Sequence, residues 1–87
     1  MKVSDIAVKV MPDDNDRISF AIKALVGNDS DDTEVLVELQ GLDSDGFEVY
    51  TLLLEGEIPI GGSKVLTTKE DYIEKDLFDQ IAEWQVK

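Results

Sequence analysis

The sequence predicts an all-β fold, an antiparallel two-sheet sandwich of six to seven strands. Over most of the chain, apolar residues recur at every second position rather than at every third or fourth. Clusters of Asp, Asn, Gly and Pro separate the alternating segments at intervals of roughly ten residues. The 87 residues correspond to one domain, so we expect a single sandwich over residues 1–87, with a closed barrel as the alternative.

Three segments in the first half of the chain alternate in this way, over residues 6–10, 17–26 and 33–40. One face of each segment is apolar and the other is largely polar, which is typical of an antiparallel sheet with one face in water. The apolar faces consist of Ile6, Val8, Val10, Ile18, Phe20, Ile22, Ala24, Val26, Val35, Val37 and Leu39. Turn clusters are expected at residues 11–16, 27–32, 43–46 and 55–62.

The second half of the chain is less regular. Residues 47–54 predict a strand that is apolar on both faces, so we expect a loop, the C-terminal segment or another molecule to cover its second face. Residues 63–67 predict a further strand, and Thr68 is a candidate N-cap. Helix-like spacing then predicts a short helix near residues 73–80, and residues 81–86 predict a final strand.

A known pattern runs from Val26 to Ser63. It consists of Val26-Gly27-Asn28 after the second strand, a turn Leu42-Asp43-x-Asp45-Gly46, and a corner Pro59-x-Gly61-Gly62-Ser63. The stretch resembles the FxLYD family and the related late-embryogenesis-abundant-like modules. The resemblance implies an immunoglobulin-like or fibronectin-type-III-like sandwich and a non-catalytic module of the kind often appended to extracytoplasmic bacterial proteins. The family has no catalytic residues to carry over.

The composition excludes several function classes. The chain has 20 acidic and 8 basic residues, a net charge of −12, no His and no Cys. Ser-His-Asp and Cys-His catalysis, disulfides and Cys-ligated zinc are therefore excluded within the chain, and we expect no enzyme. Nucleic acid and anionic lipid would be repelled, whereas a basic protein partner would be attracted.

The acidic residues are concentrated in the centre of the chain. No Lys or Arg occurs between Lys23 and Lys64, where ten acidic residues occur. If the central strands are neighbours, their glutamates form an acidic face that could bind a basic partner. The expected contact residues, called the acidic face below, are Glu34, Glu38, Glu48, Glu55 and Glu57. The plainer interpretations are a solvated surface that keeps the domain soluble, or adaptation to high salt.

Calcium binding is the alternative function. Ca²⁺ requires six to eight oxygen ligands, which Asp-rich turns could supply if they converge at one end of the sandwich. No segment has EF-hand spacing. The candidate ligands are Asp29, Asp31, Asp32, Asp43 and Asp45, with a further Asp-rich turn at residues 13–16.

Three further expectations concern association, aromatic residues and location. The chain is expected to be a monomer, or a weak homo-oligomer that pairs through an edge strand or residues 47–54. Trp84 is expected to fill the core, whereas Trp84 and Tyr72 as ligand-stacking residues are the alternative. The sequence contains no apolar run of membrane-span length and no signal-peptide core, so it predicts a cytoplasmic protein as given. An extracytoplasmic location would apply if a leader had been removed or if the chain is an excised domain.

Overall fold

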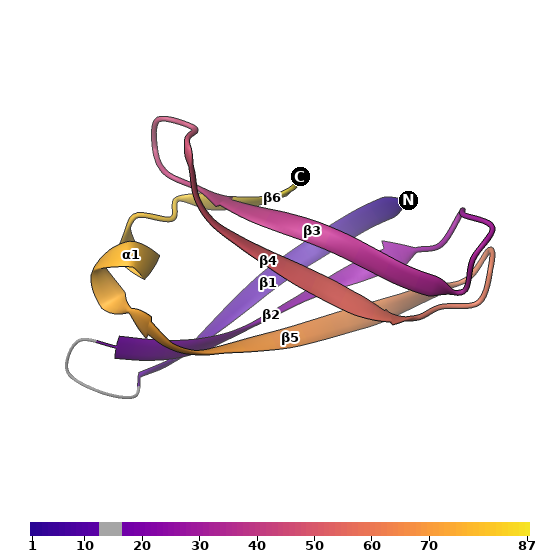
Figure 1. Cartoon of the computed structure of the whole chain (residues 1–87), viewed down its shortest axis with the longest axis horizontal. Coiled ribbons are helices and arrows are strands. Elements are labelled where there is room, and N and C mark those ends of the chain that lie inside the picture. The colour runs from indigo at the N-terminus through magenta and orange to yellow at the C-terminus, as the bar shows by residue number, and fades with distance from the viewer. Residues whose placement is uncertain (13–16) are drawn as a thin grey trace.

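The computed structural model describes residues 1–12 and 17–87 and has two stacked antiparallel sheets (Figure 1). One sheet has the order β1-β2-β5 and the other the order β4-β3-β6. This arrangement confirms the predicted all-β two-sheet sandwich. The turn predicted at residues 13–16 lies outside the described residues. The elements within them are β1 (Lys2–Pro12), β2 (Arg17–Gly27), β3 (Glu34–Leu42), β4 (Glu48–Glu57), β5 (Ser63–Glu74), α1 (Lys75–Asp79) and β6 (Glu83–Val86).

The core lies between the two sheets, and the alternating residues of β2 and β3 form its centre. Phe20, Ile22 and Leu39 are fully buried, as their alternation predicts. The sandwich closes along the side where β4 meets β5. There Leu66 packs so tightly that a Cβ atom on Gly56 would lie 2.7 Å from its Cδ2 atom. Glycine at position 56 therefore allows the two sheets to approach each other at this side.

The strand β5 is longer than the sequence predicts. It continues through Thr68 to Glu74, so the prediction of an N-cap at Thr68 is wrong. The reason is tertiary: β5 pairs with β2 along its length, from Gly27 opposite Ser63 to Arg17 opposite Glu74. That ladder overrides a weak local preference for a helix start. The short helix near residues 73–80 and the final strand are confirmed as α1 and β6.

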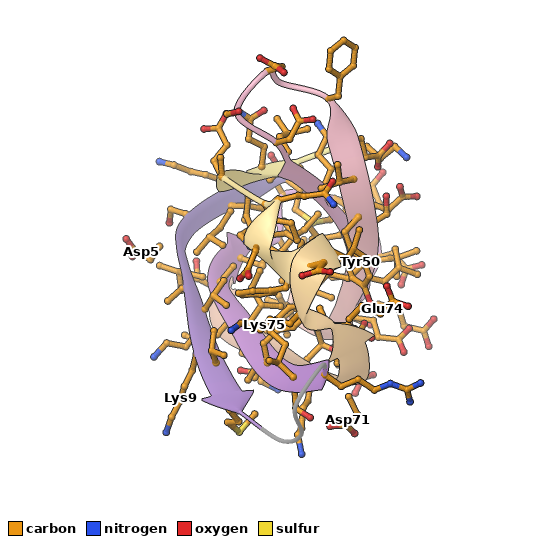
Figure 2. The ribbon with its side chains drawn as sticks, turned by 90° about the vertical axis from the view of Figure 1, so that its left-hand side faces the viewer. Asp5, Lys9, Tyr50, Asp71, Glu74 and Lys75 are labelled. Atoms are coloured by element: carbon orange, nitrogen blue, oxygen red, sulfur yellow. The ribbon has the colours of Figure 1, made fainter. Side chains whose placement is uncertain are left out.

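An aromatic cluster that includes Phe78 of α1 packs against the core. Figure 2 looks at this end of the sandwich and labels Tyr50, a member of the cluster. The ring of Phe20 lies 5.1 Å from Phe78, 5.7 Å from Trp84 and 6.2 Å from Tyr50, measured between ring centroids. Trp84 packs against the core but is only half-buried, so it fills the core less completely than the sequence predicts. Burial raises the pKa of the Tyr50 phenol, and the neighbouring Glu70 carboxylate raises it further. The side chain of Tyr72 is outside the described residues, so its predicted role stays open.

No helix in residues 1–12 and 17–87 is long and apolar enough to cross a membrane.

Candidate functional site: the outer face of the β3–β4 hairpin

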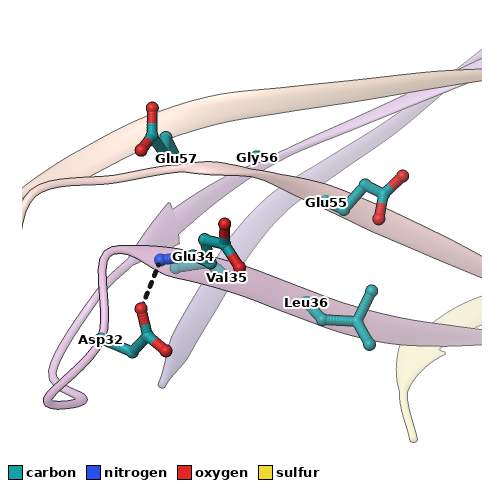
Figure 3. A pocket seen from close by; sticks show the side chains of 7 residues that line it. All are labelled: Asp32, Glu34, Val35, Leu36, Glu55, Gly56 and Glu57. Carbon is teal, nitrogen blue, oxygen red and sulfur yellow. Dashed lines mark hydrogen bonds between the residues drawn. The ribbon is translucent and has the colours of Figure 1, made fainter.

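The pairing of β3 with β4 gathers glutamates on the face that points away from the core. The register places Glu34 opposite Glu57, Leu36 opposite Glu55, and Glu38 opposite Leu53. The intervening Val35 and Val37 are buried, so side chains of these three pairs point outward. Figure 3 shows Glu34, Leu36, Glu55 and Glu57 on the two neighbouring strands. The strands carrying the acidic face are thus neighbours, as the hypothesis of a contact surface requires.

Two exposed leucines lie among these glutamates. Leu36 is 56% exposed and Leu53 is 47% exposed. The register places each leucine beside a glutamate on the opposite strand. The expectation that a loop or the C-terminal segment covers the second face of residues 47–54 is therefore wrong. Phe47, at the start of that segment, is 70% exposed.

Glu48 joins the acidic face through Lys87. The register of the hairpin shifts between Gly41 and Leu42, so Glu48 lies opposite Leu42 beyond an irregularity in the ladder. The Nζ atom of Lys87 lies 3.2 Å from Glu48 and 3.8 Å from Glu38. A hydrogen bond from the Thr51 hydroxyl, together with Lys87, lowers the pKa of the Glu48 carboxyl. Within the acidic face, Lys87 therefore balances the charge of Glu38 and Glu48 only.

The remaining glutamates of the acidic face, Glu34, Glu55 and Glu57, form no ion pair within the described part of the chain. Glu34 and Glu57 lie directly opposite each other, and like charges in that position destabilise a sheet. A shallow depression of about 530 Å³ lies between them and is lined by Asp32, Glu34, Val35, Leu36, Glu55, Gly56 and Glu57.

The structure does not bring the five candidate calcium ligands together. Asp29, Asp31 and Asp32 precede β3, whereas Asp43 and Asp45 follow it, so the two sets lie at opposite ends of a nine-residue strand (Figure 1). Across the described part of the chain, no group of three acidic side chains is placed to hold a metal ion.

Two of these aspartates, Asp32 and Asp43, have local structural contacts instead. Asp32 Oδ1 accepts the Glu34 N–H at 3.0 Å. Asp43 Oδ1 accepts the N–H groups of Asp45 and Phe47, both at 2.9 Å, and Gly46 in the same turn has a positive φ of 86°. These contacts are typical of Asx turns.

Two other aspartates lie at the surface of the turn before β3. Asp29 pairs with the N-terminal ammonium at 2.7 Å, and that hydrogen bond and charge lower the pKa of the carboxyl. Asp31 is exposed.

Asn28 positions the start of β3, a role not predicted from the sequence. Its side chain is 2% exposed, and Nδ2 donates to the carbonyls of Asp32 (2.7 Å) and Ile58 (2.8 Å). Oδ1 accepts hydrogen bonds from the N–H and hydroxyl of Ser30. Asn28 therefore joins the loop before β3 to the loop after β4. The position of Asn28, directly after an apolar strand and before a polar turn, is the feature of the sequence that could have indicated this role.

Comparisons with protein-family models, curated proteins and solved structures found no match for this chain.

Proposed function

We propose that this chain is a non-catalytic binding module that docks a basic protein segment on its acidic face. One observation carries the proposal: the β3–β4 register surrounds the exposed Leu36 and Leu53 with glutamates that are largely unbalanced. In the isolated chain this arrangement destabilises the sheet and leaves apolar surface in water. A partner that supplies both cations and apolar side chains would offset both costs.

The partner chemistry follows from this pattern. Lysine or arginine would pair with Glu34, Glu55 and Glu57, while apolar side chains would cover the two leucines. Unpaired surface charge steers association and makes its rate depend strongly on salt. The net charge of −12 opposes the pairing of two such faces, so a basic partner fits better than a second copy.

We also propose that the sandwich is of the immunoglobulin-like type. In support, β1, β2 and β5 have the order of strands A, B and E, and β4, β3 and β6 have the order of C′, C and F. The resemblance of residues 26–63 to FxLYD-type modules agrees with this order. A crystal structure whose loops connect the sheets differently would refute this part of the proposal.

A binding measurement with a defined probe tests the function. The probe is a short fluorescent peptide of alternating lysine and valine, measured by anisotropy at low salt. Replacing Glu34, Glu55 and Glu57 by Gln together should weaken binding by about tenfold, since each pair at the surface contributes only modestly. The matched control replaces Asp5, Asp76 and Asp79 by Asn, which removes the same charge elsewhere on the surface.

The control should bind nearly as well as the wild type. Equal losses in both variants would show that only net charge attracts the peptide, and the proposed docking face would then be abandoned.

A further inference from the structure

The outer face of the sheet β1-β2-β5 has a hollow between lysine side chains. The register places Ala7 opposite Lys23 and Lys9 opposite Ala21. The alternate residues of β2 are buried, so these four side chains point away from the core. Two small side chains therefore lie beside two long ones. Together with Thr67 of β5, these four residues help to line a depression of about 240 Å³, which we call the hollow.

The hollow is positively charged although the chain as a whole is strongly acidic. Lys9 and Lys23 are exposed, and Figure 2 shows Lys9 extending away from the sandwich. Lys69 lies opposite Ala21 on the other side, but Asp71 balances its charge at 3.3 Å. Within residues 1–12 and 17–87, Lys9 and Lys23 form no ion pair. The hollow thus combines small apolar side chains with two cations whose charge is not balanced by an ion pair in this part of the chain.

The turn between β3 and β4 has the complementary chemistry. Phe47 in this turn is 70% exposed. Its N–H donates to Asp43 Oδ1 and its carbonyl accepts the Asp43 N–H, each at 2.9 Å, so its backbone is held in place. No ion pair in the described residues involves Asp43 or Asp45. Residues 43–47, called the tip below, therefore present an aromatic ring and two carboxylates from one end of the second sheet (Figure 1).

We propose that the tip of one copy of this chain docks in the hollow of a second copy. Phe47 would lie on Ala7 and Ala21, and the tip aspartates would pair with Lys9 and Lys23. The sizes agree, because a cavity of about 150 Å³ is large enough for a benzene ring and the hollow measures about 240 Å³. The charges agree as well, since two carboxylates meet two ammonium groups. The backbone bonds to Asp43 reduce the entropy that Phe47 loses on docking.

This contact goes beyond the proposed function, because neither the tip nor the hollow belongs to the acidic face. It joins different surfaces of the two copies, so a complex of two copies retains one free tip and one free hollow. Association should therefore continue beyond a dimer as the concentration rises. The net charge of −12 repels whole copies. Physiological salt screens that repulsion beyond about 8 Å, whereas the ion pairs of the contact would be shorter.

Two variants that each lack one half of the contact test the inference. Phe47→Ala removes the ring from the tip, and Ala21→Gln fills the hollow with a longer polar side chain. Sedimentation equilibrium at millimolar protein and physiological salt should show an average mass that rises with concentration for the wild type. Each variant alone should associate about tenfold or more weakly. Ile60→Ala is the matched control, because Ile60 is also apolar and 58% exposed but lies outside both surfaces, and it should associate as the wild type does.

Mixing the two variants tests the pairing of the two surfaces directly. The Phe47→Ala copy still has a hollow, and the Ala21→Gln copy still has a tip. An equal mixture should therefore form a one-to-one complex and grow no further. In NMR spectra, isotope labelling of the Phe47→Ala copy should show shift changes confined to the hollow. Labelling of the Ala21→Gln copy should show changes confined to the tip.

The outcomes that would overturn the inference are specific. A wild-type chain that stays monomeric at millimolar concentration would overturn it, and so would a mixture of the two variants that stays monomeric. Equal weakening by Ile60→Ala would show nonspecific apolar association and would overturn it too. The proposed function is tested separately, because Ala21→Gln should bind the lysine–valine peptide as the wild type does. Peptide binding without self-association would leave the proposed function standing, and self-association without peptide binding would leave only this inference standing.

Discussion

The two faces of the β3–β4 hairpin come from the same backbone but carry opposite chemistry. The inner face consists of Val35, Val37, Leu39, Leu52 and Leu54, all buried. The outer face carries glutamates opposite one another and two exposed leucines. The inner face stabilises the fold by burying apolar area, whereas the outer face contributes little stability and some repulsion. Burial of the core therefore accounts for the inner face of the hairpin, and the proposed partner would account for the outer one.

Truncating one leucine on each face should give the largest difference in the free energy of unfolding between the two faces. Leu54 is fully buried, so Leu54→Ala should lower the free energy of unfolding by about 2–5 kcal/mol. Leu53 is half exposed, so Leu53→Ala should change it by no more than about 0.5 kcal/mol. Urea denaturation followed by Trp84 fluorescence measures both. Similar losses in the two variants would break the comparison, because Leu53 would then support the fold.

Replacing Asn28 measures how much its hydrogen bonds at the start of the hairpin contribute to stability. Asn28→Ala leaves the carbonyls of Asp32 and Ile58 without their donor, so it should cost about 1–3 kcal/mol in urea denaturation. Ser30→Ala removes a hydroxyl from the same loop but keeps the Asn28 amide, and it should cost less. A larger loss in the Ser30 variant would contradict this view of the loop.

The repulsion on the outer face predicts a stabilising mutation. Glu57→Gln removes a like charge opposite Glu34 and should raise the free energy of unfolding by roughly 0.2–1 kcal/mol at low salt. Added salt should reduce the gain, because it screens the same repulsion. Glu38→Gln is the matched control, since Glu38 has a cation, Lys87, at 3.8 Å. If thermal melting shows no gain for Glu57→Gln, the outer face is not electrostatically strained.

Replacing Glu48 should have the smallest effect on stability. The direction of that effect follows from the lowered pKa of the Glu48 carboxyl. The folded-state pKa lies below the ordinary glutamate value of 4.5, so the charged form stabilises the folded state. That contribution is fully present above pH 4.5 and is lost as the pH falls through the folded-state pKa. Glu48→Gln should therefore melt slightly below the wild type at neutral pH, and the difference should vanish in acid. A difference that grows in acid would contradict the assignment.

Alternation was sufficient to predict the buried faces of β2 and β3, but not the face of β1, where Val10 of the predicted apolar face is 42% exposed. In β2, the buried Phe20, Ile22 and Val26 are the residues that period two selects. The register of the hairpin could not be predicted in this way, because turn geometry and core packing set which residues lie opposite. The sequence therefore showed that acidic residues were abundant near Glu34 and Glu57 but not that these two face each other.

One wrong prediction and one unmet condition have identifiable physical causes. The strand β5 extends past Thr68 because β2 offers a long partner, which no local signal reports. The Asp-rich turns at residues 27–32 and 43–46 flank a single strand, and the two ends of a strand point apart. A strand rises by roughly 3.3 Å per residue, so the nine residues of β3 hold the two turns far apart. The predicted strand alone was therefore enough to predict that the turns are separated.

The most direct test is an amide-resolved NMR titration with the lysine–valine peptide at low salt. The account predicts saturable shift changes confined to Glu34 to Glu38 and Leu53 to Glu57, with small changes on the solvent-facing side of the sheet β1-β2-β5. Addition of salt should weaken the binding without moving the affected residues. Diffuse changes spread equally over acidic residues such as Asp5, Asp71 and Asp76 would show simple counterion attraction and would contradict a docking face on the β3–β4 hairpin.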